Sequence, residues 1–473
     1  MFDIYSEFKR KFSVSMYKNL KLKLAEMSFS KDFIHDTRGD LYPVISKSED
    51  CNEYVKDNLY KVENGSVSRL FCQFFPYATY EITIKNPIQK AGFSFSFPQF
   101  TASVLFSTSE IMYISNNVTE CREYACCNED ETTFIVSCRP GAFDVYVKKN
   151  NKHEYIHTFS DDGVINSNRY EVFSNSYVHV SVYGNTVIKS ISSYIDNGIS
   201  LADIRPIRYE NSEVMIEQGK VYLTASVRMQ EESFQGVLSW VPGTMEFSLT
   251  GAMFYDCGDG AWCGDVASSL LYHRQEHKWL LWVCSFSHGH ILAHASFDGD
   301  PRFGVNVIDV TLMKHSSEGS EFTEFLAFEG DEDPDFFYDA DNERWLMSVC
   351  RINPVTKQYA YLYFESKNAF EGYKYVGKGP DGCETGGSFV IINGEIYFIC
   401  GNDFNKTSDY RVYSKSGMKN ARFNYPDGGF RGWGTVIPVK MGSRTRYFWL
   451  TFDRHNASDY NWSYGNIYCF EAE

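Results

Sequence analysis

The sequence predicts an all-β protein with a C-terminal five-bladed β-propeller, an N-terminal β-sandwich and a short helical arm at the start of the chain. From Arg205 onward one phrase recurs about five times: a polar or acidic opening, a short apolar run, a hairpin turn and an aromatic-rich strand. It recurs at roughly fifty to sixty-five residues, near the period of a four-stranded blade. The chain also holds 33 Tyr and 38 Phe against 13 Pro, which favours strands over helices.

The predicted helical arm occupies residues 1–30. Apolar residues recur there at four-residue spacing, which indicates one or two amphipathic helices. They are Phe8, Phe12, Met16, Leu20 and Leu24. We expect the arm to pack on the body of the protein rather than to enter a membrane, and such an arm could reach a neighbouring subunit of a homo-oligomer.

For residues 31–196 the sequence predicts the β-sandwich, because polar and apolar residues alternate in short segments separated by turn-forming clusters. The segments include YATYEITIK, AGFSFSF, TTFIVSC, FDVYVKK and YVHVSVYG. Their outline resembles a concanavalin-type lectin-like module, although no motif carries that likeness. Such a domain could bind sugar or buttress its neighbour, and we favour the structural role. A linker is expected near Asn197 to Ile204.

Residues 197–473 predict the propeller, and each blade contributes one aromatic-rich strand. These strands are KVYLTASV from Lys220, KWLLWVCS from Lys278, RWLMSVCR from Arg344, EIYFICGND from Glu395 and RYFWLTFDR from Arg446. A blade cannot bury both its faces alone, so neighbouring blades close around an axis. We expect any chemistry in the funnel at that axis.

Charge and composition restrict the partners and the location. A net charge of −16 repels polyanions, so nucleic acid and acidic membrane surfaces are not expected to bind. The first residues show no apolar signal segment, no later run could span a membrane, and we expect a cytoplasmic protein. The 13 Cys are expected to be mostly free thiols in a reducing compartment, and no metal or cofactor is expected.

Three acidic residues open three successive blades. Asp265, Asp333 and Glu384 each lie about a dozen residues before the aromatic strand of their blade. That offset corresponds to the mouth of the innermost strand, so the three carboxylates should converge on the axis. One acid at a loop is often only solvated, but equivalent placement in three blades indicates a site.

The residues around these acids resemble known glycosidase motifs. DPDFFYDADNERWLM from Asp333 resembles the DPDxFxDDDGxxYL segment of glycoside hydrolase family 43 and its relatives in families 32 and 68. WCGD from Trp262 resembles their second-blade WAPD, and ETGGSFVIINGEIYF from Glu384 resembles the EGPxxxKxxGxYYL segment that carries the general acid. The resemblance covers about residues 205–473.

This resemblance implies that Glu384 is the general acid and that Asp333 sets its pKa and orients the sugar. The family's base is a first-blade Asp, usually in a DP pair, and this chain has no such pair there. Glu210 or Glu213 is therefore the expected base, and aligning Gly219 with Gly394 favours Glu210.

Glycoside hydrolysis needs one protonated carboxyl group that donates its proton to the leaving oxygen, and one ionised carboxylate that activates water or attacks carbon. Crowded carboxylates meet this need, because two like charges in a sheltered site do not both ionise readily. We expect an exo-acting glycosidase for short oligosaccharides. Family 43 implies inversion of configuration, and family 32 implies retention.

Several further side chains are candidates for binding the substrate. Arginines can bind sugar hydroxyls or close salt bridges between blades, and tryptophans can stack on a sugar or pack between blades. His288 lies in an alternating SFSHGHILAHASF segment, where three histidines on one face rarely complete a metal site by themselves, so a substrate contact is expected. The candidates are Asp265, Trp262, Arg208, His288, Arg431 and Trp433.

Two alternatives to hydrolysis remain at this level. A glycoside phosphorylase of the related five-bladed mannoside type needs one carboxylic acid and a basic phosphate pocket. That pocket would draw on Arg205, Arg208, Arg351 or Arg431. The other alternative is a non-catalytic carbohydrate-binding propeller, because a fold does not fix an activity.

Overall fold

The computed structural model describes residues 2–29, 33, 42–116, 118–124, 130–313, 329–352, 356–379, 382, 384–402, 410–423, 430–453 and 465–472. Within this part the fold is all-β, as predicted, and helix is confined to α1 (Tyr170–Phe173) and the 3-10 turns η1 (Asp162–Val164) and η2 (Phe286–His288). None of these described helices is long and apolar enough to cross a membrane.

The chain forms two compact units. The propeller unit comprises Met1–Leu20, Asn197–Asp259 and Cys263–Glu473, and the two-sheet unit comprises Lys21–Asp196 and Gly260–Trp262. The second unit is therefore an insertion between an N-terminal strand and the remainder of the propeller. Its first and last strands lie side by side, since Lys21 pairs with Asp196.

The propeller unit contains five sheets, which confirms the predicted number of blades. In each blade the second strand is the aromatic-rich segment that the sequence predicted. The four-stranded core of blade 1 is β17 (Ser200–Pro206), β20 (Lys220–Arg228), β21 (Ser233–Trp240) and β22 (Phe247–Asp256), and that of blade 2 is β23 (Val266–His273), β24 (Lys278–Ser285), β25 (Ile291–Phe297) and β27 (Thr311–Leu312). The core of blade 3 is β28 (Glu329–Asp339), β29 (Arg344–Ile352), β30 (Tyr359–Ser366) and β31 (Lys374–Lys378), and that of blade 4 is β32 (Glu384–Ile392), β33 (Glu395–Asn402), β34 (Tyr410–Ser414) and β35 (Gly417–Asn420). The core of blade 5 is β37 (Phe430–Met441), β38 (Arg444–Asp453), β39 (Ile467–Ala472) and β1 (Glu7–Val14).

The innermost strands form a closed cycle around the axis. β17 contacts β23, β23 contacts β28, β28 contacts β32, β32 contacts β37, and β37 returns to β17. Short strands extend three blades: β19 (Ile216–Glu217) and β26 (Gly304–Asp309) in blade 1, β18 (Arg208–Tyr209) in blade 2 and β36 (Arg422–Phe423) in blade 5.

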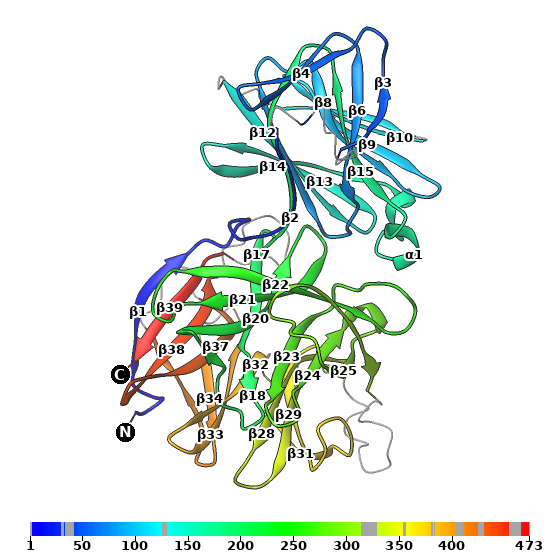
Figure 1. The fold of residues 1–473 in the computed structure, drawn as a ribbon. Coiled ribbons are helices and arrows are strands. Elements are labelled where there is room, and N and C mark those ends of the chain that lie inside the picture. Colours follow the sequence, from blue (N-terminus) through cyan, green and yellow to red (C-terminus); the bar gives the residue numbers. More distant parts are fainter. Residues whose placement is uncertain are drawn as a thin grey trace. The chain divides into compact units, whose positions relative to one another are not determined.

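The prediction of an N-terminal helical arm is wrong. β1 pairs antiparallel with β39 and completes blade 5, so the blue and red ends of the chain lie together in Figure 1. Apolar residues four apart share one face of a strand as well as of a helix, because four is a multiple of the strand period of two. Phe8 is fully buried against Trp449, with ring centroids 5.2 Å apart. The arm expected to reach another subunit is used inside its own chain.

The two-sheet unit has two sheets facing each other around one core, and the five segments predicted as strands are strands. Phe106 and Phe134, one from each sheet, stack at 4.2 Å in that core. The first sheet has the strand order β11 (Thr119–Glu123), β10 (Glu110–Ser115), β9 (Thr101–Phe106), β8 (Lys90–Ser96), β15 (Tyr177–Tyr183), β6 (Ser66–Gln73) and β3 (Val44–Lys47). The second sheet has the order β14 (Lys152–Ser160), β13 (Ala142–Lys149), β12 (Glu131–Arg139), β7 (Thr79–Lys85), β16 (Thr186–Asp196), β5 (Leu59–Glu63) and β4 (Asn52–Lys56). An additional strand, β2 (Lys21–Met27), pairs with β16 in this second sheet. The likeness to a lectin module stays a prediction.

Candidate functional site

The innermost strands of blades 1 to 4 share one irregularity near their start. In each, two residues face a single residue of the second strand, which defines a β-bulge. Each bulge contains one residue in the left-handed region. These residues are Asp203 (φ 49°), Ala267 (φ 60°), Asp333 (φ 47°) and Gly386 (φ 63°). The bulges therefore align the four blades residue by residue.

This alignment brings out Asp203, which the sequence analysis missed. It occupies the position in blade 1 that Asp333 occupies in blade 3. Asp203 is 4% exposed, and its Oδ2 accepts a 2.7 Å hydrogen bond from the Ser226 hydroxyl. Its Oδ1 is buried and has no hydrogen-bond partner among the described residues. A carboxylate with one anchored and one unpaired oxygen is suited to accepting a proton.

Asp203 escaped detection because its spacing and neighbours differ from those of Asp333. It lies 17 residues before Lys220, whereas Asp333 lies 11 residues before Arg344. It is also followed by Ile-Arg-Pro rather than directly by Pro. The available signal was the order Asp–Pro within both segments, once a longer hairpin in blade 1 is allowed.

Asp333 lies among other acidic groups. Burial, and after it the charges of Asp203 and Glu332, hold the pKa of the Asp333 carboxyl well above its usual value. Arg205 and the Gly386 amide act in the opposite direction, and that amide donates to Asp333 Oδ2 at 3.2 Å. The position predicted from sequence thus holds a carboxyl that keeps its proton to higher pH.

Glu332 is a second protonation-prone carboxyl beside Asp333. Its pKa is raised to about 7, chiefly by burial; a hydrogen bond from Tyr359 acts in the opposite direction, and the charge of Asp203 contributes to the rise. Glu332 Oε1 lies 3.1 Å from Nδ1 of His290. Asp203, Glu332 and Asp333 therefore form one acidic cluster shared by blades 1 and 3.

Glu384 begins β32 and lies two residues before the bulge residue Gly386. Its side chain is fully buried. Oε1 accepts hydrogen bonds from Arg411, at 2.7 Å, and from Tyr413. Oε2 has no hydrogen-bond partner among the residues that the structure describes. Since Gly386 also binds Asp333, the starts of β28 and β32 are joined at this point.

Asp265 has the same register relative to its bulge as Glu384, because it lies two residues before Ala267. Its carboxylate accepts hydrogen bonds from the Ser285 hydroxyl at 2.8 Å and from the Ser287 amide at 3.0 Å. It also lies near Cys263 and His288, and these three residues carry atoms that could hold a metal ion. The sequence did not link these segments.

Trp262 packs among aromatic side chains. It belongs to the two-sheet unit, where its ring packs on Phe173 at 4.3 Å and on Phe75 at 6.0 Å. The predicted sugar-stacking role of Trp262 is therefore replaced by packing in an aromatic cluster. The side chains of Arg431 and Trp433, also predicted to bind substrate, lie outside the described residues.

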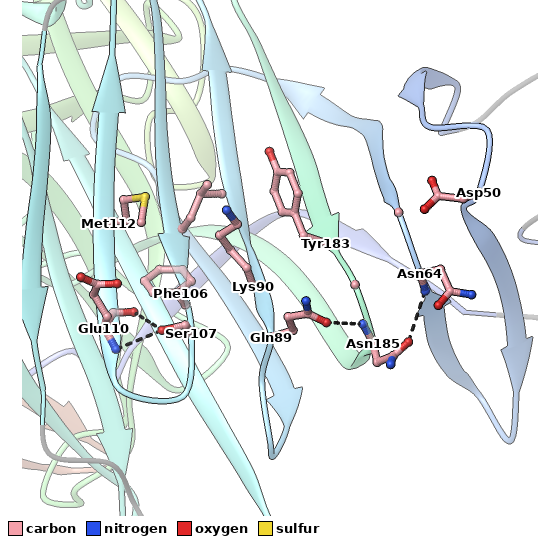
Figure 2. Close-up of a pocket in the computed structure, with 13 residues that line it drawn as sticks. Asp50, Asn64, Gln89, Lys90, Phe106, Ser107, Glu110, Met112, Tyr183 and Asn185 are labelled. Atoms are coloured by element: carbon pink, nitrogen blue, oxygen red, sulfur yellow. Dashed lines mark hydrogen bonds between the residues drawn. The ribbon is translucent and has the colours of Figure 1, made fainter.

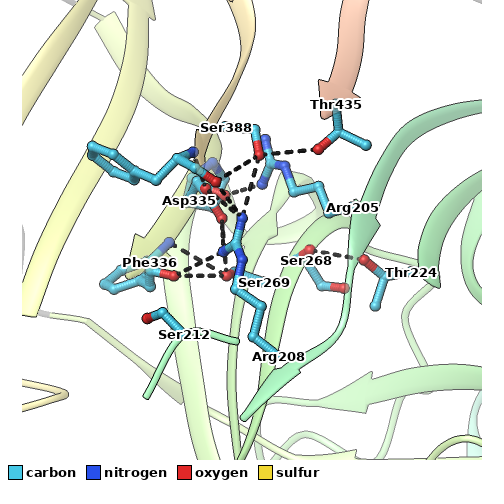
Figure 3. A network of polar contacts seen from close by, with 12 residues as sticks. Arg205, Arg208, Ser212, Thr224, Ser268, Ser269, Asp335, Phe336, Ser388 and Thr435 are labelled. Atoms are coloured by element: carbon cyan, nitrogen blue, oxygen red, sulfur yellow. Dashed lines mark hydrogen bonds and ion pairs between the residues drawn. The ribbon is translucent and has the colours of Figure 1, made fainter. Parts of the chain in front are cut away.

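Arg208 is also not placed to bind a substrate. Its guanidinium is buried and forms two hydrogen bonds with the Asp335 carboxylate, at 3.0 and 3.2 Å (Figure 3). It donates to the Phe389 carbonyl at 2.8 Å, while Ser269 donates to Asp335 at 3.2 Å. This network joins innermost strands of several blades, so Arg208 holds the propeller together.

The predicted bases Glu210 and Glu213 lie at the wrong end of the propeller. Tyr209 pairs with Tyr272, roughly 17 Å along β23 from the bulge at Ala267. Glu210 binds Arg274 at 2.7 Å; although partial burial raises the pKa of Glu210, these hydrogen bonds leave it below the usual value. Glu213 is exposed and lines a pocket of about 400 Å³ at that far end. Neither can serve the carboxylates at the strand starts.

The two-sheet unit has a polar pocket of about 640 Å³ (Figure 2). Gln89 Oε1 accepts from the Asn185 amide at 2.9 Å, and Asn185 Oδ1 accepts from the Asn64 amide at 3.2 Å. The Lys90 ammonium covers the ring of Tyr183 at 4.6 Å. That face of the Tyr183 ring is therefore not open to a sugar.

Comparisons with known proteins found similarity only at the level of solved structures. No family model and no curated protein matches this sequence. The catalytic domain of a GH62 α-L-arabinofuranosidase from Coprinopsis cinerea has 12% identity, covers 58% of this chain and 91% of that chain, and gives a TM-score of 0.38. An α-L-arabinofuranosidase from Podospora anserina in complex with cellotriose has 10% identity, coverage of 58% and 91%, and a TM-score of 0.38. An exo-β-1,3-galactanase from Clostridium thermocellum has 10% identity, coverage of 56% and 62%, and a TM-score of 0.37. None of these values assigns an activity to this chain.

Proposed function

We propose that the protein is a glycosidase that hydrolyses O-glycosyl bonds in short oligosaccharides. The observation that carries the proposal is the set of buried carboxylates at the starts of innermost strands in blades 1, 3 and 4. Asp203 and Asp333 occupy equivalent bulges, and Glu384 is tied to Asp333 through Gly386. Asp333 in this set combines burial with a raised pKa, which a non-catalytic sugar-binding propeller would not need.

Asp203 is the proposed general base, in place of Glu210 or Glu213. Ser226 anchors one oxygen of Asp203, and the other oxygen is left to accept a proton from water. Glu384 is the proposed general acid. Arg411 and Tyr413 hold its Oε1, which leaves Oε2 to donate a proton to the leaving oxygen.

Asp333 is the proposed sugar-orienting carboxyl. Its pKa is raised to about 7, so a substantial fraction of Asp333 stays protonated near neutral pH, and a protonated carboxyl can donate a hydrogen bond to a sugar hydroxyl. We further propose inversion of configuration, in which the base activates a water on the face of the sugar opposite the acid. Inverting enzymes keep the two carboxyl groups about 6.5–9.5 Å apart to admit water. An exo mode of action and a cytoplasmic location complete the proposal.

The test is turnover of a panel of aryl glycosides and short oligosaccharides. Asp203→Asn and Glu384→Gln are each expected to lower kcat by about a hundredfold or more, because each removes one proton-transfer group. Glu210→Gln is the matched control and is expected to keep full activity. Full activity of both Asp203→Asn and Glu384→Gln would overturn the proposal.

Phosphorolysis is disfavoured by the described arginines. Arg205 donates to the main-chain oxygens of Asp333 and Pro334, and Arg351 forms an ion pair with Asp331. Arg208 forms an ion pair with Asp335. The panel is therefore run with and without inorganic phosphate, and activity that requires phosphate would replace hydrolysis by phosphorolysis.

A further inference from the structure

A cluster of three different metal-binding side chains lies at the entrance to blade 2. A sulfur of Cys263, a carboxylate oxygen of Asp265 and a ring nitrogen of His288 all lie within 4.8 Å of one another. The first two residues precede β23, and His288 ends the 3-10 turn η2 after β24. Two separate segments of the propeller unit thus converge on one point.

The cluster is sheltered and its main chain is fixed. Cys263 is 8% exposed and Asp265 is 4% exposed, whereas His288 is partly exposed. Cys263 and Tyr255 exchange two main-chain hydrogen bonds, of 2.9 and 3.0 Å, which hold the loop against the end of β22. A thiol on a main chain held this way changes position little when an ion binds.

Two serines orient the other potential ligands. The hydroxyl groups of Ser285 and Ser287 each lie 2.8 Å from Asp265 Oδ2. The same hydroxyl groups lie 2.9 and 3.1 Å from Nδ1 of His288. Metal sites characteristically contain such outer partners, because they fix the orientation of the ligating carboxylate and imidazole.

The surrounding charge is suited to a cation. The sequence from Asp256 to Val266 contains three aspartates and no lysine or arginine. Asp256 serves the loop itself, since its Oδ1 accepts from the amides of Gly258 and Asp259 at 2.7 and 3.1 Å. Asp265 is a carboxylate of this loop that lies beside the Cys263 thiol and the His288 imidazole.

We propose that Cys263, Asp265 and His288 bind a Zn²⁺ ion, with the fourth position left to water. Sulfur, imidazole nitrogen and carboxylate oxygen together favour zinc over calcium or magnesium, which prefer oxygen ligands alone. Binding forms a zinc–sulfur bond and releases the Cys263 thiol proton to solvent, with no change of oxidation state. The ion would cross-link the loop before β23 to the turn after β24, a role separate from the proposed hydrolysis.

The experiment measures metal binding by the full-length protein. Bound zinc is counted by mass spectrometry after purification, and the metal-stripped protein is titrated with Zn²⁺ against a chromophoric indicator. We expect a single equivalent in the wild type and an affinity lower by about a hundredfold or more in Cys263→Ser and in His288→Gln. Cys121→Ser, which alters an exposed cysteine of the two-sheet unit, is the control and should bind zinc like the wild type.

Cobalt titration of the wild type provides a second readout that does not depend on the variants folding. Co²⁺ bound at this site should give a thiolate charge-transfer band and the intense visible bands of a tetrahedral ion. Absence of the thiolate band would overturn the proposal. Equal zinc affinity of wild type and folded Cys263→Ser, checked by thermal unfolding, would overturn it as well.

Discussion

Asp203 and Asp333 are non-glycine residues held in the left-handed region inside strands, where no turn requires it. Such backbone conformations cost of order 1–3 kcal/mol each, less for Asp than for bulky residues, and they concentrate at functional sites. Bulges re-aim side chains relative to the ordinary alternation of a strand. At the residue scale, this shared geometry distinguishes these two acids from the many other acidic residues of the chain.

The raised pKa of Glu332 predicts a pH-dependent stability. Since folding raises its pKa from 4.5 to about 7, the folded protein binds more protons than the unfolded chain between these values. Glu332 therefore destabilises the fold as pH rises through this window, by at most about 3 kcal/mol. Glu332→Gln should increase the Tm relative to the wild type progressively between about pH 5 and about pH 8.

Thermal unfolding across this pH range checks the prediction. Glu246→Gln changes an exposed carboxylate and should track the wild type at every pH. A constant difference in Tm between Glu332→Gln and the wild type would contradict the assigned cause.

Arg208 separates a structural role from a sugar-binding role. Arg208→Met should lower the free energy of unfolding by about 3–5 kcal/mol, because the Asp335 charge is left buried and uncompensated. The double variant Arg208→Met/Asp335→Asn removes that charge and should lose less stability than the single variant. Denaturant unfolding measures the stability of the single and the double variant. Unchanged stability of Arg208→Met together with loss of activity would instead indicate that Arg208 binds the substrate.

The element that the structure reinterprets most is the first strand. β1 supplies the outer strand of blade 5, so the start and the end of the chain are joined in one sheet. Its alternating burial places Phe8 in the core of that blade and leaves the adjacent Glu7 and Lys9 exposed. Ring closure therefore depends on a strand that the sequence pattern assigned to a helix.

Phe8→Ala tests this closure. Loss of a fully buried ring should lower the free energy of unfolding by about 3–5 kcal/mol. Lys9→Ala, on the exposed face of the same strand, should change it by less than about 0.5 kcal/mol. Equal, small effects of the two substitutions in denaturant unfolding would refute the role of β1 in closing the ring.

At the scale of the whole molecule, the two-sheet unit is inserted where the chain enters and leaves at neighbouring points. The Leu20 amide donates to Asn197 Oδ1 at 2.7 Å, and the Asn197 amide donates to the Leu20 carbonyl at 3.2 Å. The propeller unit therefore already joins the two ends that flank the insertion. This arrangement predicts that the propeller can fold without it.

The test variant replaces residues 21–196 by a short glycine linker. It also carries Trp262→Ser, which removes a ring that packs in the two-sheet unit. We expect this variant to form a folded propeller. One cooperative thermal transition and retained hydrolysis of small aryl glycosides are expected. The linker variant with Asp203→Asn added is the control and should fold but not turn over. A linker protein that is insoluble or lacks a transition would show that the insertion is needed to buttress the propeller.

The number of blades and their aromatic strands follow from local pattern, because strand alternation and blade period are properties of consecutive residues. The positions of Asp333 and Glu384 at the strand starts follow from the same repeat. Asp203 does not, since a bulge and a longer hairpin shift its spacing and leave only the order Asp–Pro in common with the Asp333 segment. Glu210 and Glu213 follow from the expectation of a first-blade acid where no Asp-Pro pair is present, and strand direction places them at the opposite end of the propeller.

Local sequence pattern accounts for the all-β class, for the five blades and for the position of two of the three proposed catalytic carboxyls at strand starts, because each depends on residues close along the chain. Only the folded chain shows that the first segment is a strand, that Arg208 forms an ion pair with Asp335, and that Cys263, Asp265 and His288 lie together. Each of these depends on pairing between segments distant in sequence. Such pairing is set by which surfaces can be buried together, and local periodicity does not record it.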